Sequence, residues 1–190
     1  MARPSKKSEI VEAAAYLFST KGYHATTVRD IAERAGVLSG SLYAHIANKE
    51  ALLLEIVRMA ANQFTTALDP IVHSNLMVNE KFTKAVRAHV GVITGSLDGA
   101  RIYLDEKASF GDQGRQEVLD LRRAYEDLWQ ELIDQGIAGH AFQIEDPHLA
   151  RLLVLSALNG IHHWYRPHGR LTPDIIAARY ATWLLRLLTS

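Results

Sequence analysis

The chain has 190 residues, with 21 Lys and Arg, 21 Asp and Glu, and a formal net charge of zero. This balance excludes nucleic-acid binders that act through a positive field over their whole surface, although it leaves room for a local basic face. Cysteine is absent, which excludes a disulfide scaffold, a cysteine-ligated zinc site and a cysteine nucleophile. We find no secretory signal pattern and no apolar run of membrane-spanning length, so we expect a cytoplasmic protein without a membrane partner.

Apolar residues recur every three or four positions along the whole chain, and no convincing alternating strand pattern interrupts them. This periodicity predicts an all-α protein of about nine helices. We expect the first helix over residues 8–21, capped by Ser8 and ended by Gly22. Small hydroxyl residues cap helix N-termini, and glycine favours helix C-termini.

Two short helices are expected next. The first begins at Thr26 or Thr27 and stops at Gly36. The second runs from Ser39, which we expect to be its cap, to Ile46. Two short helices joined by a tight turn that contains glycine form a helix-turn-helix.

The rest of the chain also reads as helices. Asn48 is the predicted cap of a helix over residues 49–68, which Pro70 should end because proline interrupts helical hydrogen bonding. A later helix over 112–135 should stop at Gly136. The other helices are expected over residues 79–97 and 99–109, from Asp146 to near Tyr165, and from Thr172 to near the C-terminus.

The segment from Thr26 to Glu50 carries the most specific pattern in the chain. It reads Thr-Thr-Val-Arg-Asp-Ile-Ala-Glu-Arg-Ala-Gly-Val-Leu-Ser-Gly-Ser-Leu-Tyr-Ala-His-Ile-Ala-Asn-Lys-Glu and resembles the DNA-binding segment of the TetR family of repressors. With the preceding helix, the resemblance covers about residues 8–54. It implies an all-helical homodimer with a helix-turn-helix domain over 1–50, linked through the helix 49–68, and a ligand-binding and dimerisation domain over 51–190.

The second short helix has the chemistry of a DNA reader. Its small first residues let backbone and hydroxyl groups approach base edges, and its dipole favours phosphates. Tyr43, His45 and Lys49 can each donate to a phosphate. Helix capping, aromatic packing and simple solvation are the structural alternatives for individual members. The predicted DNA-binding residues are Thr27, Arg29, Ser39, Gly40, Ser41, Tyr43, His45 and Lys49.

The charge distribution supports a local footprint for DNA. Residues 1–50 contain seven Lys or Arg and five Asp or Glu, so this segment carries +2 and the remainder −2. Arg3, Lys6 and Lys7 precede the first predicted helix. They form either an arm that reaches phosphates or a solvated terminus.

The last two predicted helices are apolar on more than one face, which indicates a burial partner besides the chain's own core. A two-fold homodimer is the natural partner, and intramolecular packing is the alternative for part of each face. The residues predicted for the dimer interface are Leu152, Leu155, Ile161, Trp164, Tyr180, Trp183 and Leu187.

A second, shorter pattern bears on the ligand. The stretch from Trp164 to Pro173 resembles a linker in one branch of the TetR family, and residues 38–43 point the same way. That branch is similar to the regulators of sterol and fatty-acid breakdown, some of which respond to acyl-CoA thioesters. The resemblance implies a bulky, partly acidic effector. The predicted pocket residues, for which core packing or surface exposure is the alternative, are Phe64, Phe82, Arg101, Tyr103, Phe110, Tyr125 and Trp129.

We find no catalytic motif, neither a phosphate-cradling glycine loop nor Gly-x-Ser-x-Gly, and we predict no enzyme activity, cofactor or metal site. The sequence therefore predicts a homodimeric repressor that binds a pseudo-palindromic DNA operator and is released by a small molecule. The alternative is a helical carrier of a small apolar ligand, which leaves the helix-turn-helix pattern without a role.

Overall fold

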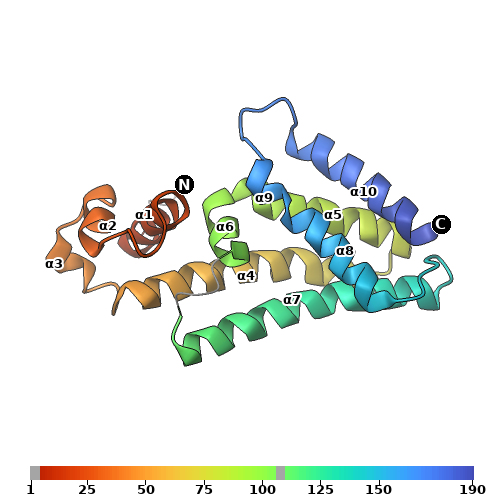
Figure 1. Cartoon of the computed structure of the whole chain (residues 1–190), viewed down its shortest axis with the longest axis horizontal. Helices are drawn as coiled ribbons and strands as arrows, with labels where there is room; N and C mark the ends of the chain where they lie inside the picture. Colours follow the sequence, from red (N-terminus) through yellow and green to blue (C-terminus); the bar gives the residue numbers. More distant parts are fainter. Residues whose placement is uncertain (1–4, 106–109) are drawn as a thin grey trace. The chain divides into compact units, whose positions relative to one another are not determined.

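The structure is a computed structural model that describes residues 5–105 and 110–190, and over these residues it contains helices and no strand (Figure 1). The predicted all-α class is confirmed. None of the described helices is long and apolar enough to cross a membrane. The helices are α1 (Lys6–Lys21), α2 (Val28–Arg34), α3 (Ser39–Leu42), α4 (Lys49–Val72), α5 (Val78–Gly95), α6 (Leu97–Asp105), α7 (Asp112–Ala138), α8 (Pro147–Asn159), α9 (Ile161–Trp164) and α10 (Pro173–Thr189).

The chain forms two compact units. The N-terminal unit comprises Met1–Ala60 and Asp98–Leu119, and the C-terminal unit comprises Ala61–Leu97 and Asp120–Ser190. Helices α4 and α7 each contribute residues to both units. The last four residues of the predicted helix 99–109 lie outside the described part of the chain.

In the N-terminal unit, α2 packs against both α1 and α3 around buried apolar side chains. The predicted cap Ser8 is wrong, because the Ser5 hydroxyl caps α1 and accepts the Ser8 N–H at 3.1 Å. Gly22 ends α1 as predicted, with a φ of 90° that favours glycine. The core of this unit includes Ile10, Ala14, Phe18, Ile31, Leu42 and Leu53.

Helix α4 begins where the sequence predicts and ends later. The Asn48 side chain caps it by accepting the Ala51 N–H at 2.7 Å. The predicted end at residue 68 is wrong, because α4 continues through Pro70 to Val72. The turn that follows Pro70 still forms a backbone hydrogen bond, and Val72 is completely buried. Near a helix end, the loss of one N–H donor is outweighed by burial of the following apolar side chain.

In the C-terminal unit, α10 packs along α5, and α8 packs against both (Figure 1). The predicted caps Asp146 and Thr172 accept the N–H groups of Leu149 and Ile175 at 2.9 and 3.4 Å. The predicted helix from Asp146 to near Tyr165 is divided into α8 and α9 at Gly160. The core of this unit includes Phe82, Val86, Val90, Ile93, Val154, Leu158, Ile176 and Leu184.

Gly136 does not stop α7, which continues to Ala138. A Cβ atom at this position would overlap the buried ring of Phe142. Gly136 also accepts the Phe142 backbone N–H through its carbonyl, at 3.0 Å. The absence of a side chain at Gly136 therefore makes room for an aromatic ring and does not stop the helix at this residue.

Candidate DNA-reading and ligand-binding sites

Helix α2, the first helix of the helix-turn-helix, has a closed capping box at its N-terminus. The Asp30 N–H donates to the Thr27 hydroxyl at 3.1 Å, and the Thr27 N–H donates to the Asp30 carboxylate at 2.9 Å. The Lys21 ammonium, 2.6 Å from the same carboxylate, and the Thr27 N–H lower the pKa of Asp30 to about 2. Of the two predicted caps, Thr27 is confirmed. Thr26 is buried and donates its hydroxyl to the carbonyl of Gly22 at 2.8 Å.

Helix α3 is shorter than predicted. It contains four residues, and a series of turns with backbone bonds from Ala44, His45 and Ile46 follows it. The predicted cap Ser39 is wrong, because α3 has no side-chain cap and Leu38 stands at that position. Tight 3₁₀-type bonds satisfy the backbone of so short a segment. The side chain of Ser39 is exposed and free of a capping role.

Seven of the eight residues predicted to read DNA are exposed on the N-terminal unit. Ser39, Gly40, Ser41, Tyr43 and His45 are all exposed on α3 and the turn after it, and Thr27 and Arg29 are exposed at the start of α2. Tyr43 is 58% exposed, so its ring is not part of the core. Leu38, which the sequence pattern did not indicate as a DNA-reading residue, is 82% exposed immediately before α3. Its position in the sequence, immediately before three small residues, is the feature from which its exposure could have been predicted.

Lys49 has a structural role that the sequence did not indicate. Its ammonium donates to the carbonyls of Tyr23 and Thr26 at 2.9 and 3.0 Å and lies 4.3 Å from the centre of the Tyr23 ring. An ammonium has three N–H donors, so one is left over for a phosphate. Lys49 therefore joins the loop after α1 to the start of α4.

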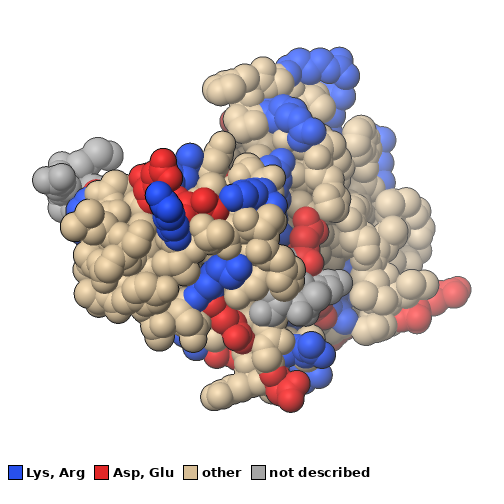
Figure 2. Space-filling model, turned by 60° about the vertical axis from the view of Figure 1, so that its left-hand side comes forward, with Lys and Arg blue, Asp and Glu red and all other residues tan. Residues whose placement is uncertain are grey.

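The basic residues at the start of the chain, which the sequence left open between an arm and a solvated terminus, lie partly within a helix. Lys6 and Lys7 are the first residues of α1 and pair with Glu9 and Glu55, each at 2.7 Å. Arg3 lies outside the described residues. On the face shown in Figure 2, basic side chains are interspersed with acidic ones. This face therefore has no continuous basic surface.

Four of the predicted pocket residues come together in the C-terminal unit. Phe64 lies 5.2 Å from Tyr125 and Phe82 lies 5.9 Å from Trp129, measured between ring centres. All four rings are buried. We call them, with His89, the aromatic cluster. The other predicted pocket residues, Arg101, Tyr103 and Phe110, belong to the N-terminal unit.

His89 is the residue of this cluster that was not among the predicted pocket residues. Its ring lies 5.0 Å from the ring of Phe64, and its Nδ1 atom is 2.8 Å from the Tyr125 hydroxyl oxygen. Burial lowers the pKa of His89 from 6.5 to about 3, so the imidazole is neutral. Its place seven residues after Phe82, on the apolar stripe of α5, was the available signal.

Two buried nitrogens of the aromatic cluster lack hydrogen-bond partners among the described residues: Nε2 of His89 and Nε1 of Trp129. Each such group costs about 1–3 kcal/mol of stability. Buried polar atoms of this kind call for a hydrogen-bond partner from outside the chain, either an internal water or a bound ligand.

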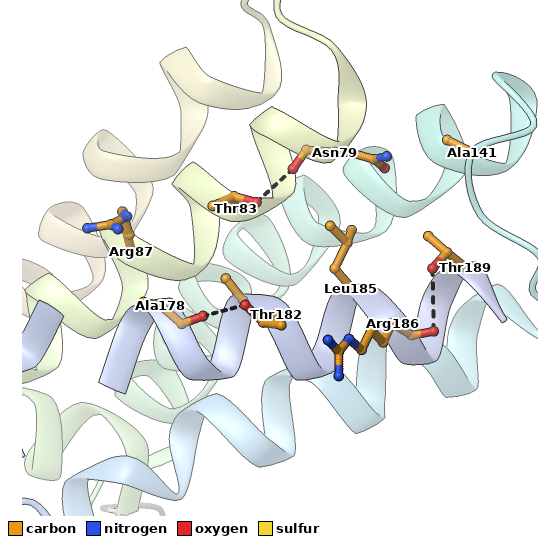
Figure 3. A pocket seen from close by; sticks show the side chains of 10 residues that line it. Asn79, Thr83, Arg87, Ala141, Ala178, Thr182, Leu185, Arg186 and Thr189 are labelled. Carbon is orange, nitrogen blue, oxygen red and sulfur yellow. Dashed lines mark hydrogen bonds between the residues drawn. The ribbon is translucent and has the colours of Figure 1, made fainter. Parts of the chain in front are cut away.

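A second candidate site is a groove of about 670 Å³ between α5 and α10, with Arg87 on one helix and Arg186 on the other (Figure 3). The hydroxyls of Thr83, Thr182 and Thr189 donate to backbone carbonyls of their own helices. The groove therefore contains no buried polar group that calls for a ligand, unlike the aromatic cluster.

The residues predicted for the dimer interface on α8, α9 and α10 differ in their exposure. Leu155 and Ile161 are buried at 6% and 0% exposure, so their assignment to an interface is wrong. They have almost no surface left to cover. Tyr180 is half-buried between Trp164 and Trp183. The exposed apolar residues of these helices, which we call the apolar face, are Leu149, Leu152, Leu153, Trp164, Ile175, Trp183 and Leu187.

Comparison with known proteins places these sites in a family. Residues 10–56 match the model for bacterial regulatory proteins of the tetR family, and residues 75–188 match the model for the tetracyclin repressor-like C-terminal domain. The HTH-type transcriptional repressor KstR2 of Rhodococcus jostii is 32% identical over 190 residues, which is 99% of this chain and 93% of that protein.

Solved structures also match nearly the whole chain. The ketosteroid transcriptional regulator KstR2 of Mycobacterium tuberculosis has a TM-score of 0.91 and 30% identity, and the match covers 100% of this chain and 97% of that one. AibR in complex with isovaleryl coenzyme A and operator DNA has a TM-score of 0.84 and 25% identity, covering 97% and 98% of the two chains. With its helix-turn-helix and these matches along its whole length, the chain belongs to the TetR family of DNA-binding transcriptional regulators.

Proposed function

We propose that this regulator is a homodimeric repressor that binds a pseudo-palindromic operator and leaves it when a small molecule binds the C-terminal unit. In this proposal residues 1–50 read the DNA, and residues 51–190 hold the ligand and the dimer interface. As a DNA-binding regulator it acts in the cytoplasm and has no catalytic step. The exposed group of small polar residues on α3 is the observation that carries the DNA-reading part.

For the DNA contacts, α3 enters the major groove with Ser39, Gly40 and Ser41 against base edges. Tyr43 and His45 donate to phosphates on one side of the groove. Arg29 and the hydroxyl and backbone N–H of Thr27 face the phosphates on the other side. The +2 charge of residues 1–50 is small, so few counterions are released and the salt dependence of binding is shallow.

Homodimer formation is supported by the apolar face. Seven large apolar side chains are exposed on α8, α9 and α10, and Trp183 and Leu187 are each more than half exposed. Exposed apolar side chains in this number on adjoining helices are typical of an interaction site. A two-fold axis lets the same face of a second copy cover it and places two α3 helices against the two halves of a palindrome.

For the effector, we propose an acyl-CoA or another bulky apolar molecule with an acidic part. Two observations support this class. AibR, a relative by structure, was solved with isovaleryl coenzyme A and operator DNA, and the aromatic cluster gives the C-terminal unit an apolar interior. The effector releases DNA only if it binds the released conformation more tightly than the DNA-bound one, because a ligand shifts an equilibrium by its differential affinity alone.

The DNA-reading part is tested by selecting duplexes from a randomised pool at low salt. We expect a pseudo-palindrome to be enriched. Ser41→Ala should change the preferred base at one position of each half-site, whereas Tyr43→Phe should weaken all duplexes about equally. Lys84→Ala on α5 is the control. Enrichment of no duplex would favour the ligand-carrier alternative.

Lys49→Ala is a poor test of phosphate binding, because the ammonium also holds the carbonyls of Tyr23 and Thr26. His45→Gln avoids this difficulty, since His45 is exposed and lies in the turn after α3.

The dimer is tested by sedimentation. Trp183→Arg on the apolar face should give a monomer with weak operator binding, because it places a charge where a second copy packs. Met59→Arg on α4, also an exposed apolar position, is the matched control and should remain a dimer. A wild-type monomer that binds the palindrome tightly would contradict this part of the proposal.

A further inference from the structure

The aromatic cluster contains two hydrogen-bonding groups that the fold itself does not use. Nε2 of His89 and Nε1 of Trp129 have no partner in the described part of the chain. The two residues are 1% and 0% exposed, and their ring centres are 6.2 Å apart. They come from α5 and α7 of the same unit.

Both groups are hydrogen-bond donors. The indole nitrogen can only donate. For His89, the partner of Nδ1 is the Tyr125 hydroxyl at 2.8 Å. A phenol is a better proton donor than a neutral imidazole N–H, and an imidazole lone pair is a better acceptor than a phenol oxygen. The hydroxyl therefore donates to Nδ1, which leaves the hydrogen of His89 on Nε2.

The surroundings favour a neutral acceptor. The ring neighbours of the two donors are Phe64, Phe82 and Tyr125, none of which is charged. Burial also keeps His89 uncharged, as its lowered pKa shows. A carboxylate would pay a large desolvation cost among these rings, whereas a carbonyl oxygen accepts two N–H groups without a charge.

A surface groove lies on two of the helices that carry the cluster. The groove, of about 580 Å³, runs along α4 and α5. The residues that line it include Gln63, which precedes Phe64 in the sequence, and Ala88, which precedes His89. Gly91 also lines it, and a Cβ added there would touch nothing within 4 Å.

We propose that His89 Nε2 and Trp129 Nε1 donate hydrogen bonds to a neutral carbonyl oxygen of the effector, whose apolar body packs among the rings of the aromatic cluster. This inference rests on the proposed effector response. A thioester carbonyl and a ring ketone are two sources of the same chemistry, and matched ligand pairs distinguish them.

The test uses the full-length protein with two ligand pairs. Hexadecanoyl-CoA is compared with S-hexadecyl-CoA, the thioether that lacks the carbonyl, and androstane-3,17-dione is compared with androstane. We expect wild type to bind the carbonyl member of one pair about tenfold more tightly, by thermal shift and operator release. The pair that shows the preference identifies the source of the carbonyl.

His89→Phe and Trp129→Phe should each reduce this preference to about twofold or less. Lys84→Ala, at an exposed position outside the aromatic cluster, is the control, and it should keep the preference. The indole ¹H–¹⁵N resonance of Trp129, assigned by its loss in Trp129→Phe, should move with the carbonyl ligand and stay nearly fixed with its partner.

Failure of the inference and failure of the proposed function give different results. If wild type leaves the operator equally well with both members of each pair, the effector response stands and the carbonyl site is refuted. That result, with an unmoved indole resonance, would show that internal water satisfies the donors. If no ligand of either pair changes stability or operator binding, both the effector class and the carbonyl site are refuted.

Discussion

Acid sensitivity of the folded chain should come in large part from His89. The imidazole is completely buried and uncharged, because burial lowers its pKa from 6.5 to about 3. In the unfolded chain the same side chain takes up a proton below pH 6.5. The unfolded state therefore binds more protons than the folded state in this range, and the free energy of unfolding falls as the pH falls. The loss begins near pH 6.5 and continues to about pH 3.

The size of this loss follows from the two pKa values. At pH 5 the unfolded His89 is almost fully protonated and the folded His89 almost fully neutral. Lowering the pH from 7 to 5 then removes about 2 kcal/mol of unfolding free energy through this one group. Replacement of His89 by leucine, which is apolar and of similar volume, should remove this part of the pH dependence. The absolute stability of the variant does not affect the argument, because only the difference between two pH values is compared.

Urea unfolding followed by circular dichroism at pH 7 and pH 5 measures this difference. We expect it to be smaller in His89→Leu than in wild type by about 2 kcal/mol. His168→Gln, at an exposed loop position, is the control with the same number of histidines and should behave like wild type. An unchanged difference in His89→Leu would refute the interpretation of His89 as a buried neutral group.

Three further predictions concern stability and are measured by thermal and urea unfolding. Gly136→Ala should destabilise by about 1–3 kcal/mol, because its methyl group overlaps a packed ring. Gly91→Ala, where a methyl group meets nothing, should stabilise by up to about 1 kcal/mol, and equal effects would contradict the packing argument. Thr27→Ala should cost about 1 kcal/mol through loss of the capping box, and Thr27→Ser should restore most of it. Lys81→Met should cost about 1–3 kcal/mol, because the buried ammonium donates to a carbonyl at the end of α4 and to a glutamine on α7. Lys84→Met, which loses only an exposed ion pair, should cost less than about 1 kcal/mol.

Features governed by a few neighbouring residues could be predicted. Thr27, Asn48, Asp146 and Thr172 cap their helices as expected. A cap needs only a side chain and an N–H group two or three residues later, so the sequence contains both partners. The helix-turn-helix and the family followed from the same local pattern of caps, glycines and apolar positions.

Features that depend on distant partners could not be predicted. Ser8 and Ser39 look like caps, but the start of each helix is set elsewhere. Lys49 binds carbonyls 23 and 26 residues away in the chain. The sequence shows a lysine at the start of a helix and gives no sign of where its ammonium lies.

The amino-acid sequence by itself determined the all-α class, the capped helices, the reader segment and the absence of a whole-chain positive field. Only the tertiary structure decided that α4 passes through Pro70, that Gly136 makes room for Phe142 and that Leu155 and Ile161 lie inside. It also brought His89 and Trp129, which are 40 positions apart, into one apolar cluster. The physical reason is range: capping and periodicity act over one or two helical turns, whereas burial and hydrogen-bond satisfaction depend on which helices meet.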